Sequence, residues 1–307
     1  MIVVYGTVCL DRLRVVPSLP QQGSYVEIES ERSALGGEAA NTAAALASWG
    51  DEVTLVGNSL GVGPAAEETR AHLEDCSLGG ALIPPADHDG PYCDIYITPD
   101  GERTMFGWGF DPMHDRHGLS LLPTKRDAWL TADANHGSAA REAISRGRQA
   151  GMRLYTLDFV EPQEPVGPDV IWQGSTAWIR TVGKPEKTKA WIKDFHGRHG
   201  CLMIMTEGEH GVWLMHEDGR LDRLPAFPAP AMVDATGAGD AFRAGMLHGL
   251  DAGWPLGECL AFASATGALA CGRLGGAANA PTVAAIQGLV AANPWIAGQY
   301  REVKSAG

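Results

Sequence analysis

The chain has 307 residues, of which 45% are hydrophobic and 20% charged, a composition typical of a folded globular protein. This apolar fraction excludes disorder as the dominant state, and no apolar run approaches the ~20 residues that a membrane-spanning helix needs. The net charge of −13 argues against nucleic acid as a partner, because nucleic-acid phosphates require a basic surface.

The sequence favours a cytoplasmic location. Met1–Gly6 lacks the basic stretch and long apolar run of a signal peptide and resembles a first strand instead. The six cysteines are scattered without a C-x-x-C pair, which indicates reduced thiols and neither a disulfide framework nor a zinc site. We expect no membrane partner.

Short apolar runs with strand character alternate with helical stretches along most of the chain. We expect strands at Ile2–Tyr5, Val53–Val56, Ala128–Leu130, Met152–Asp158, Ala177–Thr181 and Leu202–Thr206. We expect helices at Glu38–Trp49, Ala65–Glu74, Ser138–Ala150, Pro185–His196, Gly239–Leu250, Leu256–Cys271 and Thr282–Ala291. This alternation predicts an α/β fold with a doubly wound, mostly parallel central sheet and helices on both faces.

Two segments depart from this alternation. Ser24–Ser30 alternates with period 2, and Tyr92–Thr98 with Arg103–Phe106 forms a hairpin pattern whose turn contains Asp100-Gly101. They predict a small, half-exposed β-sheet that acts as a lid, or alternatively edge strands of the main sheet. The main domain would comprise residues 1–11, 36–90 and 107–307, and the lid residues 12–35 and 91–106. Exposed lid edges favour a homodimer through the lid.

The segment Asp234–Phe242, which reads Asp-Ala-Thr-Gly-Ala-Gly-Asp-Ala-Phe, carries the strongest chemical signal. At Gly237, Ala238 and Gly239, small residues at the start of a helix let backbone N–H groups converge on an anion. Asp240 follows in the first turn, where a carboxylate can accept a proton from an attacking hydroxyl. The alternative is a tight turn with an acidic residue that only favours the helix dipole. No P-loop is present.

This segment resembles the second signature of the ribokinase-like (PfkB-type) carbohydrate kinases, and other segments match in the expected order. They are Val4–Asp11, Gly36-Gly37-Glu38-Ala39-Ala40-Asn41, Val56-Gly57-Asn58, the lid turn Pro99–Thr104, Thr206–Gly211 and Gly275-Gly276-Ala277. Together they span nearly the whole chain.

The resemblance implies a role for each matched residue. Asp240 would be the catalytic base, with the Gly237, Ala238 and Gly239 amides as the anion hole. Asp11, Gly36, Gly37, Asn41 and Arg103 would bind the substrate, whereas Thr206, Gly208, Gly211, Ser264 and Gly276 would bind the nucleotide. Asp234 and Thr236 resemble part of a monovalent-cation site. The implied cofactors are ATP and Mg²⁺, with K⁺ as the ion of the monovalent-cation site.

Simpler interpretations stay open at these positions. Asp11, expected at the end of the first strand where α/β sheets place ligands, is otherwise a solvated turn residue. Gly36 and Gly37 are otherwise needed for a close helix–sheet contact, and Thr206–Gly211 otherwise forms a simple hairpin. Arg103 either reaches an anionic substrate or lies over the lid sheet.

The sequence departs from the family pattern at the metal and sugar sites. The Asn-x-x-Glu that organises Mg²⁺ in the family is missing from Trp178–Glu186, where Glu186 is the available substitute. Glu38 stands where the family often has lysine. We therefore expect an ATP-dependent kinase that phosphorylates a hydroxyl, most often a primary one, of a small sugar or polyol. The alternatives are a nucleoside kinase and a catalytically weak sugar- or nucleotide-binding regulator.

Overall fold

The central layer is an eight-stranded sheet with the strand order β12-β11-β10-β9-β8-β7-β1-β4. The structure, a computed structural model, describes residues 1–110, 118–160, 164–177, 179, 188–276 and 280–303. The strands of this sheet are β1 (Ile2–Gly6), β4 (Val53–Gly57), β7 (Trp129–Asp133), β8 (Arg153–Leu157), β9 (Val170–Ser175), β10 (Leu202–Thr206), β11 (Val212–Met215) and β12 (Leu221–Leu224). All neighbours from β10 to β4 pair in parallel. The pairs β10–β11 and β11–β12 are antiparallel, so β11 alone runs against the other strands of this sheet.

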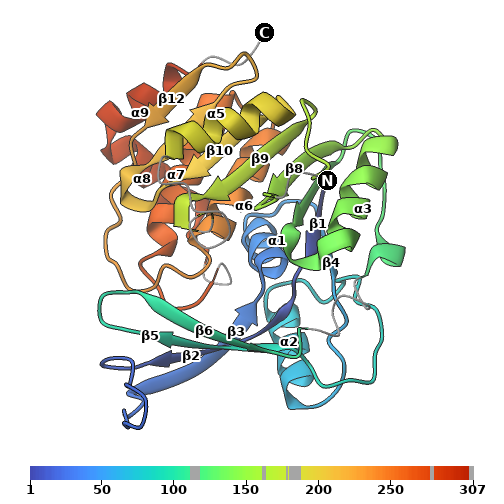
Figure 1. Ribbon diagram of the computed structural model, residues 1–307, viewed down its shortest axis with the longest axis vertical. Coiled ribbons are helices and arrows are strands. Elements are labelled where there is room, and N and C mark those ends of the chain that lie inside the picture. The colour runs from blue at the N-terminus through green and yellow to red at the C-terminus, as the bar shows by residue number, and fades with distance from the viewer. Residues whose placement is uncertain (111–117, 161–163, 178, 180–187, 277–279, 304–307) are drawn as a thin grey trace.

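Helices cover both faces of this sheet (Figure 1). They are α1 (Glu38–Ser48), α3 (Gly137–Gln149), α5 (Thr188–His199), α6 (Ala238–Asp251), α7 (Leu256–Ala270), α8 (Val283–Ala292) and α9 (Pro294–Arg301), whereas α2 (Pro64–Asp75) packs on the second sheet described below. Two separate apolar cores result, one including Leu46, Ala244 and Leu260, and the other including Ile144 and Phe195. The predicted doubly wound architecture is confirmed.

The chain reverses its direction of travel across the sheet beside β1. From β1 it proceeds to β4 on one side and later returns to β7 on the other side. In open α/β sheets, ligands bind outside the carboxyl ends of the strands at such a switch point. The ends of β1 and β7 therefore mark the place to look for a site.

A second sheet with the order β3-β2-β5-β6 lies below the main domain in Figure 1. Its strands are β2 (Cys9–Val15), β3 (Ser30–Gly36), β5 (Tyr92–Ile97) and β6 (Arg103–Trp108). Because β2 begins only three residues after β1 ends, this lid sheet continues directly from the carboxyl edge of the main sheet. The expected lid hairpin is thus confirmed as the antiparallel pair β5–β6.

Three expectations about strands were wrong. Residues 24–29 are mostly exposed and form no strand. The strand β3 begins at Ser30, which is the first residue of this segment to pair with β2. In the segment Ala177–Thr181, where a strand was expected, Ala177 and Ile179 are helical, and residues 178, 180 and 181 lie outside the described residues. The strand of this part of the chain is β9, whose apolar run is interrupted by the buried Gln173. Asp11 does not end β1 but lies within β2 of the lid sheet.

Two composition-based expectations can be compared directly with the structure. All six cysteines are free thiols. Over the residues that the structure describes, none of the helices is both long and apolar enough to cross a membrane.

Candidate active site

Asp240 is buried in the first turn of α6, at the carboxyl edge of the main sheet. Only 6% of its surface is exposed. The Asn41 Nδ2 donates to its Oδ2 over 3.0 Å, and an Arg243 guanidinium nitrogen lies 3.7 Å from its Oδ1. Burial raises the pKa of Asp240 to about 6, while the positive charge of Arg243 and the Asn41 hydrogen bond limit the rise. The carboxylate is therefore ionised near neutral pH but able to take up a proton, as a general base must.

The start of α6 opens as the glycine pattern predicts. Gly237 precedes the helix with φ 75°, a left-handed conformation that glycine adopts without strain. The N–H groups of Gly237 and Gly239 have no acceptor among the described residues, and no side chain caps the helix. The Ala238 N–H, in contrast, donates to the Ala235 carbonyl over 3.3 Å. Two of the three predicted anion-hole amides are thus free.

Asn41, on α1, contacts Asp240 directly. It is 3% exposed, and its Oδ1 has no partner among the described residues. Gly276, which we expected near the nucleotide base, lies against Asn41 instead: a Cβ at this position would come within 2.4 Å of the Asn41 side chain. Glycine at position 276 therefore leaves the space in which Asn41 reaches Asp240. This packing explains the glycine without a contact to a nucleotide.

Asp11 points from the lid sheet toward the same region and is 5% exposed. Its burial raises its pKa to about 7. A Cβ on Gly36 would come within 2.1 Å of the Asp11 carboxylate, and one on Gly37, at φ 96°, within 2.2 Å of the Thr7 carbonyl. Close packing within the chain thus requires glycine at both positions. Gly37, at the start of α1, makes the kind of close contact that the simpler interpretation described, whereas Gly36 packs on a side chain of the lid sheet.

Three further carboxylates surround Asp240. Glu38 begins α1, Asp133 ends β7, and Asp158 follows β8 with a strained φ of 59°. One oxygen each of Glu38 and Asp158 is buried without a partner among the described residues. Burial raises the pKa of Glu38 strongly and that of Asp158 to about 7. The sequence did not single out Asp133 or Asp158. The available signal was an acid at the end of the predicted strand Met152–Asp158 and another three residues beyond the predicted strand Ala128–Leu130.

Asp234 links two loops beside the anion hole. It is fully buried, its Oδ1 accepts from the Thr236 N–H and hydroxyl over 2.8 and 2.6 Å, and its Oδ2 accepts from the Gly275 N–H over 2.8 Å. These three donors are sufficient to satisfy the carboxylate. No group of three or more His, Cys, Asp or Glu in the described part of the chain is arranged to hold a metal.

The residues expected around the nucleotide fall into two groups. Thr206–Gly211 connects the antiparallel strands β10 and β11, so the hairpin of the simpler interpretation is present. Within it, a Cβ on Gly208 would meet open space, whereas one on Gly211 would collide with the Leu224 carbonyl. Ser264 lies on α7 and is 8% exposed. Gly208 thus leaves room for a ligand, while Ser264 is buried in the core.

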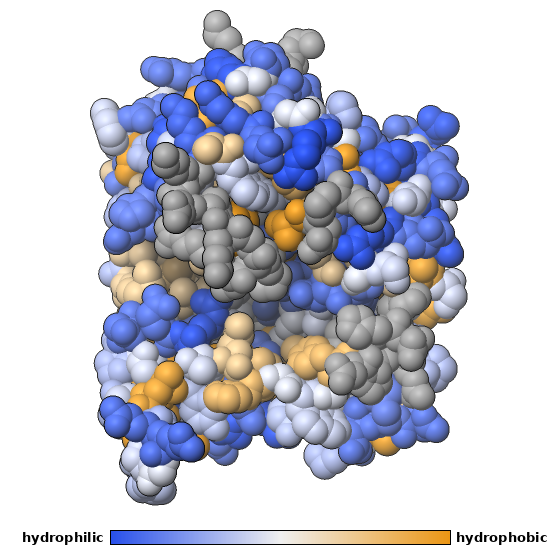
Figure 2. Space-filling view, viewed as in Figure 1, coloured by the Kyte–Doolittle hydropathy of each residue, from blue (hydrophilic) through white to orange (hydrophobic). Residues whose placement is uncertain are grey.

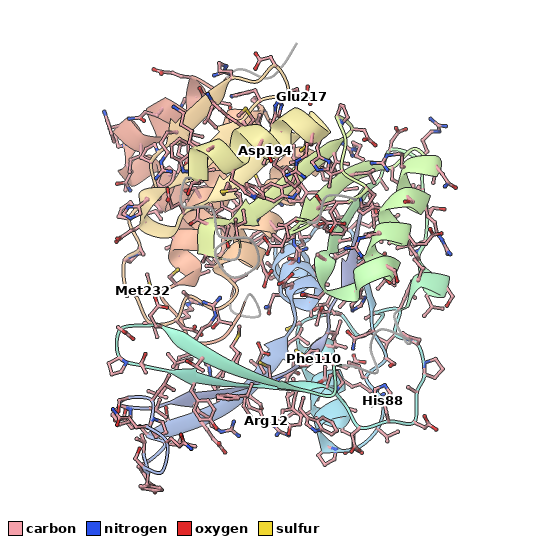
Figure 3. The ribbon with its side chains drawn as sticks, viewed as in Figure 1. Arg12, His88, Phe110, Asp194, Glu217 and Met232 are labelled. Carbon is pink, nitrogen blue, oxygen red and sulfur yellow. The ribbon has the colours of Figure 1, made fainter. Side chains whose placement is uncertain are left out.

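The lid covers the site from the opposite side. Figure 2 shows a furrow between the main domain and the lid sheet. In Figure 3, Phe110 lies on the side of the lid that faces the main domain, and Met232 lies on the loop above the lid tip, where a Cβ on Gly101 would come within 3.0 Å of Met232. Arg103, exposed at the start of β6, lowers the pKa of both Asp11 and Asp240, so its charge faces the furrow. Glu186 lies outside the described residues.

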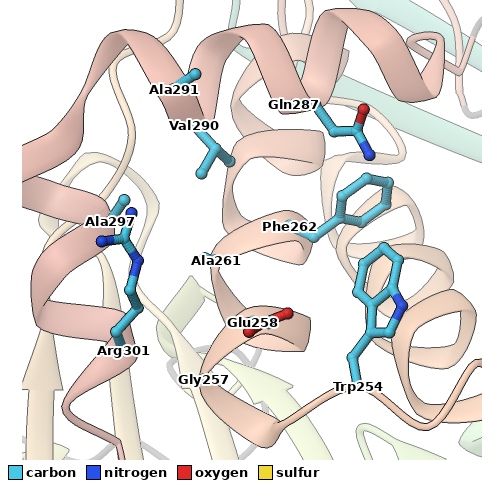
Figure 4. A pocket seen from close by; sticks show the side chains of 10 residues that line it. All are labelled: Trp254, Gly257, Glu258, Ala261, Phe262, Gln287, Val290, Ala291, Ala297 and Arg301. Atoms are coloured by element: carbon cyan, nitrogen blue, oxygen red, sulfur yellow. The ribbon is translucent and has the colours of Figure 1, made fainter.

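A separate cavity of about 370 Å³ lies between α7, α8 and α9 (Figure 4). Its lining includes Trp254, Phe262 and Val290, with Glu258 and Arg301 at its polar positions. None of its lining residues belongs to the group around Asp240.

Comparison with known proteins places the chain in a family. The profile of the pfkB family carbohydrate kinases matches residues 1–113 and 173–283. An uncharacterized sugar kinase from Dictyostelium discoideum is 27% identical over 92% of this chain and 95% of its own length. Among solved structures, Arabidopsis thaliana ribokinase complexed with ribose and ATP superposes with a TM-score of 0.75 at 18% identity, covering 94% of this chain and 97% of its own.

A nucleoside kinase from Burkholderia thailandensis in complex with inosine superposes similarly, with a TM-score of 0.74 at 20% identity, covering 95% of this chain and 97% of that one. At these identities the structural matches establish the ribokinase-like fold, and the family profile covers more than half of the chain. The chain therefore belongs to the pfkB family of carbohydrate kinases and is an ATP-dependent sugar or nucleoside kinase with a ribokinase-like fold and a lid sheet.

Proposed function

We propose that this protein transfers the γ-phosphoryl group of ATP to a hydroxyl, preferentially a primary one, of a small sugar or related polyol. The observation that carries the proposal is the buried Asp240 carboxylate one residue beyond the free Gly239 amide. In the reaction, the acceptor oxygen forms a bond to the γ-phosphorus while the bond to the ADP oxygen breaks. The acceptor proton passes to Asp240.

The amides at the start of α6 would stabilise the charge on the transferring phosphoryl group. Backbone donors act without reorganisation, and the positive end of the helix dipole adds to their effect. This solution suits a chain with a net charge of −13, because the anion is held by local N–H groups and not by the overall field.

The acceptor side of the site favours an uncharged polyol. Asp11 and Asn41 offer hydrogen-bond partners for hydroxyl groups, which supports a sugar. A sugar phosphate is disfavoured because the Asp240 carboxylate would repel it, and Arg103 on the lid is the exposed cation that faces Asp240 among the described residues. A nucleoside remains the second candidate, since the furrow is also bordered by the apolar Phe110 and Met232 (Figure 3).

The residues present fit the cofactors unequally. Gly208 supports a nucleotide over the Thr206–Gly211 turn, because its Cα faces open space. Mg²⁺ binds nucleotide phosphates together with one or two carboxylates, and the unpartnered oxygen of Asp158 fits that need in place of Asn-x-x-Glu. When bound, Mg²⁺ neutralises charge on the β- and γ-phosphates. Asp234 and Thr236 already satisfy each other, so K⁺ is not required to explain their geometry.

The test is acceptor-stimulated ADP release with Mg²⁺, measured over a panel of pentoses, hexoses, ketoses, sugar acids and nucleosides, with and without K⁺. The proposal predicts ADP formation with at least one neutral sugar or polyol. Ligand-induced thermal stabilisation without ADP formation would instead support the catalytically weak regulator, and turnover with nucleosides alone would support the second candidate. A dependence on K⁺ would support the monovalent-cation site.

We also propose that residues 12–35 and 91–106 move with the lid sheet and that its outer face joins two copies of the chain. On that face, the Arg12 guanidinium lies 3.9 Å from the centre of the Tyr92 ring, which stacks on Trp108 at 5.4 Å. Figure 3 shows Arg12 directed away from the main domain. Arginine and aromatic residues are enriched in protein interfaces. A dimer mass in sedimentation that Trp108→Ser reduces to that of a monomer would support this; a monomeric wild type would refute it.

A further inference from the structure

Arg243 is a fully buried arginine one helical turn after Asp240. It has no exposed surface, which is rare for arginine unless its charge is paired. Its Nε donates to the Thr42 hydroxyl over 2.8 Å and its Nη2 to the Glu38 carbonyl over 2.5 Å. The same Nη2 lies 3.7 Å from the Asp240 Oδ1. One guanidinium therefore contacts the first turn of α1 and the catalytic carboxylate together.

The partners of Arg243 are themselves tied to both helices. The Thr42 hydroxyl lies 2.9 Å from the Glu38 carbonyl and 3.4 Å from the Asp240 carbonyl, so it bridges α1 and α6. From the sheet, the Gln173 Nε2 donates to the Gly239 carbonyl over 3.0 Å. The start of α6, with its free amides, is thus fixed by polar contacts to α1 and β9.

The surroundings of Asp240 are otherwise acidic. Among the described residues, the charged groups that face it from the neighbouring elements are Glu38 on α1, Asp133 at the end of β7, Asp158 after β8, Asp11 on β2, Arg103 on β6 and Arg243 on α6. Arg103 is exposed on the lid. Among these groups Arg243 is the buried cation, and its charge lowers the pKa of Asp240, Glu38 and Asp158.

We propose that Arg243 is a positioning residue for phosphoryl transfer: its guanidinium keeps the Asp240 carboxylate ionised and aligned with the free amides at the start of α6. This inference rests on the proposed function, in which Asp240 is the base. A guanidinium suits the task because its rigid fork binds two acceptors while its charge acts on a third. A purely structural tie between α1 and α6 would instead affect stability without affecting the pH dependence of catalysis.

Two substitutions separate the charge of Arg243 from its geometry. Arg243→Met removes the charge at similar volume, and we therefore expect the pKa of Asp240 to rise. The acid limb of the kcat/KM profile should move to higher pH by about one unit or more, and activity should be partly restored near about pH 8.5. Arg243→Lys keeps the charge but loses the fork. Its acid limb should stay within about 0.3 pH units of wild type, while kcat falls about tenfold at every pH.

Arg198→Met is the matched control, because Arg198 lies on the surface of α5, where its contacts are an ion pair with Asp194 and the ring of Phe195 at 5.4 Å. It should leave the pH profile and kcat unchanged. Urea unfolding establishes that each variant is folded before its kinetics are compared. If Arg243→Met does not fold, Arg243→Lys decides: a kcat within about twofold of wild type would overturn the inference.

A failure of the positioning role of Arg243 can be distinguished from a failure of the proposed function. Asp240→Asn is assayed in parallel. If Asp240→Asn abolishes turnover and a folded Arg243→Met keeps the wild-type acid limb, the positioning role is wrong and the kinase mechanism stands. If Asp240→Asn turns over like wild type, the proposed base itself is wrong.

Discussion

The open start of α6 makes a specific prediction about Gly239. A Cβ added at this residue would meet no atom within 4 Å, and Gly239 is helical without a positive φ. Alanine should therefore fit without strain. Because Cβ atoms of a helix tilt toward its N-terminus, the new methyl group would project into the space in front of the free amides, where we place the transferring phosphate.

The expected effects on stability and on catalysis have opposite signs. Alanine in place of helical glycine stabilises a protein by about 0.5–1 kcal/mol; in the first turn we expect the low end of this range. Loss of one oxyanion donor lowers kcat by about 10²–10³-fold. Since the methyl group obstructs the amide without deleting it, Gly239→Ala should lower kcat/KM for ATP by about 10- to 10³-fold.

The chain offers matched controls for this substitution. Gly288 on α8 and Gly298 on α9 are also helical glycines whose added Cβ would meet open space. Alanine at either position should raise the unfolding free energy in urea similarly and leave ATP kinetics unchanged. If Gly239→Ala is as stable as the controls and retains wild-type kcat/KM for ATP, the phosphate does not bind at the start of α6.

Three further predictions follow from the acidic groups and the glycine that packs on one of them. With the pKa of Asp240 at about 6, kcat/KM should fall as the pH drops through about 6, which a pH–rate profile measures; a flat profile down to about pH 5 would contradict it. The folded-state pKa of Asp11 is raised to about 7, so the fold favours the protonated carboxyl, and the stability that this form contributes is lost as the pH rises from about 4 through 7. Asp11→Asn should therefore raise the unfolding free energy by about 1–3 kcal/mol at pH 8 and leave it unchanged near pH 4. Gly36→Ala forces a methyl group to within 2.1 Å of the Asp11 carboxylate. The substitution should lower the free energy of unfolding in urea by about 1–3 kcal/mol and raise the KM for the acceptor. An unchanged KM would show that Asp11 does not bind the acceptor.

The sequence was sufficient for the architecture of the main domain. Parallel strands buried on both faces, such as β1 and β10, are nearly continuous apolar runs, and amphipathic helices such as α3 alternate with them. β9 was missed because Gln173 and Gly174 interrupt its apolar run. Gln173 is buried there because it accepts from the Tyr155 hydroxyl over 2.6 Å and donates to Gly239, partners that only the folded chain brings together.

The part of the candidate site that lies in one continuous segment could be predicted from the sequence. The part that is assembled from several distant segments could not. The first turn of α6 was predicted with Asp240 in place, since its glycines and acid are consecutive. Asp133, Asp158 and Arg243 were not singled out, because their relation to Asp240 arises from the order of β7 and β8 in the sheet and from the packing of α1 on α6. Asp11 was placed on the wrong strand, because a break between β1 and β2 is not marked by any turn residue other than Gly6.

Turnover by Asp240→Asn tests the central claim most directly. The variant keeps the shape of the side chain but cannot take up the proton of the attacking hydroxyl. The kcat for acceptor-dependent ADP release should therefore fall by about 10²–10⁴-fold, with little change in the KM for ATP. The control is Asp194→Asn on α5, a surface carboxylate whose side chain is 72% exposed, far from the lid in Figure 3, and it should behave like wild type. An Asp240→Asn enzyme whose kcat stays within a few-fold of wild type would contradict the account.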